Sequence, residues 1–178
     1  LIAIAQNFQV PFSEMQDILE SMNRLSNQFN VTNNDLLNGL ARVGPLAKEV
    51  GLSLREINAI TGTITGLTGR PGQEAGSSLK SIITSLATPT VQENLKTLFD
   101  IDVKDQTGEL KDFSDLIGDL AIRFGELSKA DRAQLLQIVG KKQQAARLAV
   151  VLNNFVLTQA NYLRQLQDVN TVEEENER

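Results

Sequence analysis

The stretch GQEAGSSLKSIITSL, residues 72–86, carries the pattern on which the fold prediction depends. Four large apolar residues have the three- and four-residue spacing of one helix face: Leu79, Ile82, Ile83 and Leu86. This spacing is typical of a helix that buries one side. Gly72 and Gly76 lie four residues apart at its start and would let a second helix backbone approach closely. The stretch therefore predicts a helix packed tightly against another helix.

The same spacing extends over most of the chain, so nearly every segment is predicted to be helical. The other apolar stripes are Met15, Ile18, Leu19, Met22, Leu25 and Phe29; Leu36, Leu37, Leu40, Val43, Ala47 and Val50; Ile57, Ile60, Ile64 and Leu67; Val91, Leu95, Leu98 and Phe99; and Phe113, Leu116, Ile117, Leu120, Phe124 and Leu127. We expect these stripes to face one another in a common core.

Local signals predict where the helices begin and end. Three pairs have the spacing of an N-terminal cap: Ser53 with Glu56, Thr90 with Glu93, and Ser128 with Asp131. Gly51 is expected to end a helix, and the run Gly69–Gly72 to form a turn between two helices. Pro45 should kink or break its helix because it lacks an N–H group, and Gly140 should end or bend another.

One segment departs from helical spacing. Ile101 and Val103 alternate with polar residues, and the sequence from Asp105 to Gly108 has turn chemistry before Leu110. Alternation of this kind around a turn is typical of a β-hairpin. We therefore expect one small hairpin near residues 101–111.

The C-terminal part has a different period. Its apolar positions follow a heptad register with one polar member, Gln159: Leu148, Leu152, Phe155, Tyr162, Leu166 and Val169. This register is typical of a coiled-coil seam or a long packed helix. It extends over about three heptads, so docking on the chain's own domain and an oligomeric seam both remain open.

These patterns together predict a mainly α protein: a compact bundle of helical hairpins with one small β-hairpin and a long C-terminal helix of coiled-coil character. We expect three parts, an N-terminal helical part over residues 1–68, a helical core over 69–147, and a long helix over 148–178 leading toward a rod. The chain starts with Leu1, and we expect it to be a piece of a longer protein.

Composition excludes several function classes. The 178 residues include no Cys and no His, which excludes disulfides, zinc sites of thiolate or imidazole, and Ser-His or Cys-His catalytic pairs. The formal net charge is −5 and aromatic residues make up 4%, so direct nucleic-acid binding is not expected. We predict no enzyme activity and no cofactor.

Three patterns of chemical interest fail on inspection. The glycines around residue 72 match neither a P-loop nor a dinucleotide-binding motif. Asp100, Asp102 and Asp105 resemble the start of a calcium loop, but Lys104 and Lys111 occupy positions five and twelve. The glutamates are scattered with no convincing acid–base pair: Glu56, Glu74, Glu93 and Glu126. No metal or catalytic site is predicted.

Four segments in order resemble the core region of phage tail tape measure proteins: residues 72–86, 95–103, 108–113 and 127–141. The earlier run 50–56, VGLSLRE, resembles a helix start upstream of that core. The motif positions are Gly72, Glu74, Ala75, Gly76, Leu79, Gly108, Leu127, Ser128, Asp131 and Gly140. One departure is Val139, which stands where the family has Phe.

The resemblance implies a structural virion protein located in the tail, and in the host cytoplasm during assembly. Such proteins set tail length, template the tail tube, and leave the tube at genome ejection. The implied partners are the tail tube protein, tail tip or assembly chaperone proteins, and other copies of the chain; membrane contact is possible for the full-length parent.

Two alternatives belong to other classes. A cellular scaffold could use the same C-terminal coiled coil to bind partners. A cell-wall hydrolase domain occurs in some tape measure proteins, but the lack of His and Cys makes this segment a poor host for one.

Overall fold

The computed structural model describes residue 6 and residues 11–155. Over this range the chain is almost entirely helical. The α-helices are α2 (Phe12–Phe29), α3 (Asn33–Ala47), α4 (Leu54–Thr68), α5 (Gly72–Leu86), α6 (Pro89–Phe99), α7 (Phe113–Glu126) and α8 (Lys129–Asn153), and a 3-10 helix, η1 (Lys48–Val50), follows α3. The prediction of a mainly α fold is confirmed.

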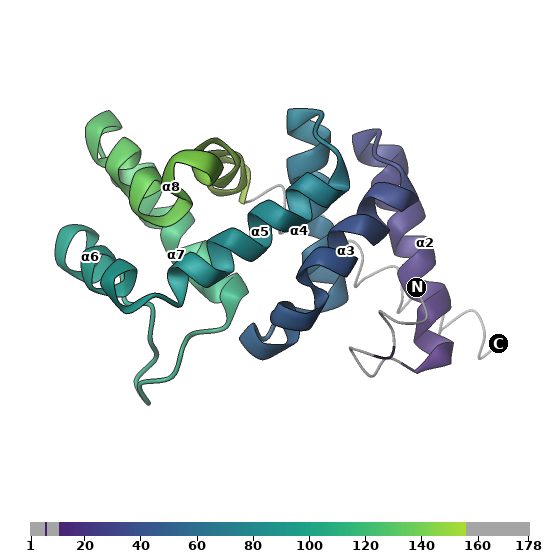
Figure 1. The fold of residues 1–178 in the computed structure, drawn as a ribbon, viewed down its shortest axis with the longest axis horizontal. Helices are drawn as coiled ribbons and strands as arrows, with labels where there is room; N and C mark the ends of the chain where they lie inside the picture. The colour runs from purple at the N-terminus through teal and green to yellow at the C-terminus, as the bar shows by residue number, and fades with distance from the viewer. Residues whose placement is uncertain (1–5, 7–10, 156–178) are drawn as a thin grey trace.

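Figure 1 shows how the helices are arranged. Helices α2, α3 and α4 gather at one end, α6, α7 and α8 gather at the other, and α5 runs between the two groups. Helix α5 packs against α3, α4 and α8, and α3 is its main partner. Helices α3 and α4, from the part predicted to end at residue 68, therefore pack directly against helices of the predicted core.

Helix α4 lies at the centre of the first group. Every residue from Ile57 to Thr65 is buried, and α4 contacts α2, α3, α5 and α8. Two of its buried hydroxyls are satisfied within the helix: Thr61 donates to the carbonyl of Ile57 and Thr63 to that of Ala59, each at 2.7 Å. Such bonds let a polar side chain be buried without an unpaired donor.

Most predicted helix ends are found in the structure. Ser53 and Glu56 form a capping box at the start of α4, and Ser128 accepts a hydrogen bond from the amide of Asp131 at the start of α8. Gly51 ends η1 with φ 72°, and Gly69 ends α4 with φ 64°. Because these caps depend on nearby residues only, the local sequence predicts their positions.

One predicted boundary is wrong, and one of the two outcomes predicted for Pro45 is not found. The cap expected at Thr90 and Glu93 is absent, because α6 begins at Pro89 and its N-cap is Thr88, two residues before the predicted one. A proline at this first position needs no hydrogen-bond donor. Pro45 does not break α3 either: it lies in the last turn, and the chain continues into η1.

The predicted β-hairpin near residues 101–111 is not supported. The described chain has no strand here, only one antiparallel bridge between Lys104 and Leu110. The turn is organised by Asp105, whose carboxylate accepts hydrogen bonds from the amides of Thr107 and Glu109. Ile101 and Val103 are buried because they join the helical core. Their alternation therefore reflects packing on helices and not a paired sheet.

Three residues predicted to lie on buried stripes are exposed: Leu19, Leu67 and Leu98. Each lies at the edge of its helix stripe, where a rotation of part of a turn carries the side chain into solvent. The buried residues of the stripes form one continuous core that extends from Ile18 to Leu152.

Candidate functional site: the α3–α5 crossing and the bend in α8

The crossing of α3 and α5 is lined by glycines from both helices. A Cβ atom added at Gly72 would lie 1.9 Å from the carbonyl oxygen of Asp35, and one added at Gly76 would lie 2.6 Å from that of Gly39. These neighbours are backbone atoms and cannot move aside as a side chain does. The two helix backbones are therefore in direct contact, which only glycine allows at these positions.

Asp35 joins the starts of the two helices. Its Oδ1 atom accepts a 2.9 Å hydrogen bond from the amide of Gly72, and its Oδ2 atom accepts bonds from the amide and hydroxyl of Thr32. The first amides of a helix have no acceptor within it, so Asp35 supplies one for α5 while completing the cap of α3. The bonds from Gly72 and Thr32 lower the pKa of Asp35 below its ordinary value.

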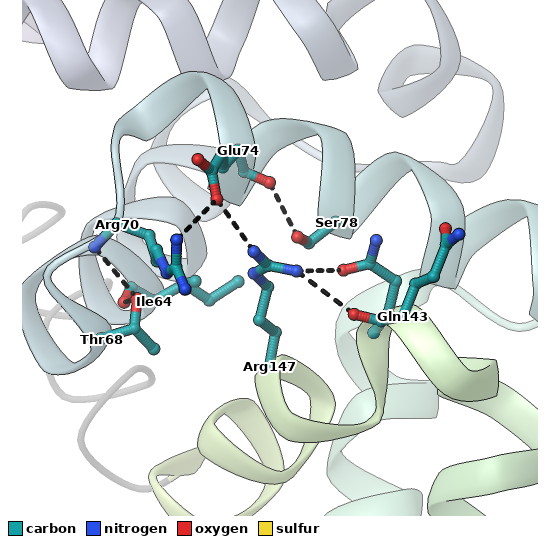
Figure 2. Close-up of polar contacts among 8 residues, drawn as sticks. Ile64, Thr68, Arg70, Glu74, Ser78, Gln143 and Arg147 are labelled. Carbon is teal, nitrogen blue, oxygen red and sulfur yellow. Dashed lines mark hydrogen bonds and ion pairs between the residues drawn. The ribbon is translucent and has the colours of Figure 1, made fainter.

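The remaining motif residues of α5 divide between its two faces. Ala75 and Leu79 are buried in the core. Glu74 lies on the partly exposed side, where its carboxylate is 2.9 Å from the guanidinium of Arg147 in α8 and 3.8 Å from that of Arg70. Figure 2 shows Arg147 reaching across to Glu74 from α8.

Arg147 is fixed by several contacts at once. Besides Glu74, it donates hydrogen bonds to the carbonyl of Gln143 at 3.2 Å and to the side chain of Gln144 at 3.0 Å. Its side chain is 21% exposed, against 44% for Glu74. The pair lines an open surface pocket of about 410 Å³ with Pro71, Gln73, Ser77, Ser78 and Gln144.

The chemistry of this pocket is that of a neutralised ion pair. Within the described residues there is no group of three or more acidic residues placed to hold a metal ion. The charges of Arg147 and Glu74 neutralise each other. The hydroxyl of Ser78 donates a hydrogen bond to the backbone carbonyl of Glu74 at 2.7 Å. The arrangement stabilises the contact between α5 and α8.

Helix α8 bends sharply in its middle. Lys141 has φ 51° and ψ −171°, a conformation foreign to a helix, and it directly follows Gly140. The bend turns the second half of α8 so that Arg147 reaches Glu74. A Cβ added at Gly140 would lie 2.7 Å from the backbone of Ala145, so the bend also depends on this glycine. The sequence prediction that Gly140 ends or bends its helix is confirmed.

The other motif residues lie apart from this crossing. Gly108 has φ 88° in the turn before α7 and nothing within 4 Å of its Cβ position. Leu127 is partly buried against the core between α7 and α8, and Ser128 and Asp131 cap α8. The structure therefore brings together the α5 positions, whereas the positions 108 and 127–131 shape separate turns.

The described part of the heptad register faces the chain's own core. Leu148 and Leu152 are buried, and Phe155 packs on the core beside Gly118 of α7. The predicted seam positions Tyr162, Leu166 and Val169 lie outside the described residues.

Sequence reasoning missed three residues that make the crossing and the bend. Asp35 could have been noticed, because Thr32 and Asp35 have capping-box spacing. Gly39 and Arg147 carry no local signal, since their roles depend on contacts with distant parts of the chain.

Comparison with known families finds a match over most of the chain. Residues 1–140 match the family of phage-related minor tail proteins. The match covers well over half of the 178 residues. The chain belongs to the phage-related minor tail protein family.

As a minor tail protein, the chain is a helical structural component of a phage tail, where it interacts with other tail components. No solved structure matches it. None of the helices in the described part has the length and apolar character needed to cross a bilayer.

Proposed function

We propose that this minor tail protein is a segment of a tail tape measure protein, which sets tail length, templates the tail tube and leaves the tube at genome ejection. The observation that carries the proposal is the ordered set of motifs from Gly72 to Lys141, within a chain that matches a phage tail family. A helix advances about 1.5 Å per residue, so a long helical chain converts residue number into length.

Within such a protein, the segment acts as a compact module attached to an extended rod. Helices α2 to α8 fold back on one another through a shared core, and this packing shortens the distance that each residue spans. The chain that follows α8 would lead out toward the rod. The module's surface would contact the tail tube protein and tail tip or assembly chaperone proteins.

The same proposal covers where and with what the protein acts. It would assemble in the host cytoplasm, associate with other copies of itself, and contact a membrane only as part of the longer parent. The family match favours this role over that of a cellular scaffold, because scaffolding predicts no relation to phage tails.

An amber codon at Gln73 in the encoding phage or prophage tests the role in assembly. On a non-suppressing host we expect particles without tails of normal length, and on a suppressing host normal tails that contain peptides of this chain by mass spectrometry. Infectious particles with normal tails on the non-suppressing host would refute the proposal. The suppressing host is the matched control.

A further inference from the structure

Apart from Gly140, the bend of α8 lies in a sequence that favours a straight helix. Residues 141–145 read Lys-Lys-Gln-Gln-Ala, all good helix formers. Yet Lys141 has φ 51° and ψ −171°, a region that is essentially restricted to glycine. The two other described non-glycine residues with positive φ, Asn30 and Asp100, lie at helix C-caps, where the left-handed conformation is ordinary. At Lys141, local preference and observed conformation disagree.

Contacts with the rest of the fold impose the bend. The second half of α8 is anchored by the Glu74–Arg147 ion pair and by three buried residues, Leu148, Val151 and Leu152. The close approach of Gly140 to the backbone of Ala145 exists only in the bent form, because residues five apart in a straight helix do not meet in this way. A straight α8 would carry Arg147 and the three apolar residues away from these partners.

We propose that α8 is a two-state helix: bent in this fold, and straight when residues 148–155 leave the core and pair with a second copy of this chain. The sequence indicates that the pairing partner is a second copy of the chain. Leu148, Leu152 and Phe155 begin a heptad register that continues to Val169, which is the pattern that like helices bury against one another. Because the same side chains serve both partners, docking on the core and pairing between copies are mutually exclusive.

The bent state thus blocks self-association, and straightening permits it. Two substitutions act in opposite directions. Gly140→Ala places a methyl group against the Ala145 backbone and favours the straight form. Lys141→Gly permits the observed φ without strain and favours the bent form.

Spin-label distances in the full 178-residue chain test the proposal. The chain has no native cysteine, so Lys129→Cys and Asn153→Cys, both at exposed positions of α8, provide a unique pair of labels. A straight helix would separate these backbones by about 36 Å. We expect a shorter distance in the parent chain, a shift toward about 36 Å in Gly140→Ala, and no such population in Lys141→Gly.

Sedimentation of the same variants tests the coupling to pairing. Gly140→Ala should associate at concentrations at least about ten times lower than Lys141→Gly does. If circular dichroism shows that Gly140→Ala is unfolded, Arg147→Gln supplies the opening variant, because it removes the anchor at Glu74. Distances that are the same in all folded variants would overturn the proposal. So would a lengthened α8 that stays monomeric wherever the parent chain is monomeric.

Discussion

The amide nitrogen of Gly72 lies 2.9 Å from the Oδ1 atom of Asp35 and donates a hydrogen bond to it. This contact joins the first turns of α5 and α3, although the residues are 37 positions apart. It also explains why the two backbones touch, since a side chain at residue 72 would separate the donor from the acceptor. The crossing is therefore built from a carboxylate and glycines acting together.

Gly72→Ala should destabilise the fold strongly. Its new Cβ would lie 1.9 Å from a backbone oxygen, so the helices must move apart. We expect the free energy of unfolding, measured by urea denaturation, to fall by about 3 kcal/mol, at the upper end of overpacking costs. Gly125→Ala is the matched control: nothing lies within 4 Å of that position in α7, and alanine there should leave stability equal or raise it by up to about 1 kcal/mol. Equal changes in the free energy of unfolding for the two substitutions would contradict the close contact between the backbones of α3 and α5.

Asp35 should make the protein sensitive to acid. Its pKa is lowered in the folded chain, so its contribution to stability is present above its ordinary pKa and is lost as the pH falls through the folded value. Asp35→Asn should cost about 1 kcal/mol at pH 7, because a charged hydrogen-bond acceptor is lost. The difference from the parent chain should shrink below about pH 4, as the parent carboxyl becomes protonated. A difference that stays constant between pH 7 and pH 3 in urea titrations would show that Asp35 does not act as a carboxylate.

The Glu74–Arg147 ion pair should contribute modestly to the stability of the fold. With Glu74 44% exposed, solvent screens the attraction, and a double-mutant cycle with Glu74→Gln and Arg147→Gln should give a coupling of about 0.5–1 kcal/mol. Added salt should reduce it. The more exposed pair of Lys96 and Asp102 provides a comparison and should show a smaller coupling. A coupling of zero at low salt would mean that the pair does not anchor α8.

Gly108→Ala should destabilise the fold for a different reason. The position is open, but φ is 88°, so the expected loss is the backbone strain of about 1–2 kcal/mol. Gly108→Asn should lose less, because asparagine tolerates positive φ better. Thermal unfolding of the two variants checks the order, and greater stability of the alanine variant would exclude a strained turn.

Much of the fold is predictable because its signals are local. Ser53 with Glu56 and Ser128 with Asp131 start helices that the structure contains, and Gly51 and Gly69 end others. The hairpin prediction is wrong because the alternation of Ile101 and Val103 does not say what covers them; here the helical core does.

The site is less predictable because it depends on contacts between distant segments. Glycine spacing identifies Gly72 and Gly76 as positions of close approach, yet nothing in the sequence pairs them with Gly39 and Asp35. The bend in α8 is only partly predictable: Gly140 signals it, but the positive φ at Lys141 depends on tertiary contacts, because the residues that follow favour a helix.

Tail length in an insertion variant tests the proposed function most directly. About 100 codons for helix-forming heptads, inserted in frame between Asn170 and Thr171 of the phage gene, should lengthen every tail by about 150 Å in electron micrographs. Tails of unchanged length that contain the enlarged protein would contradict the account.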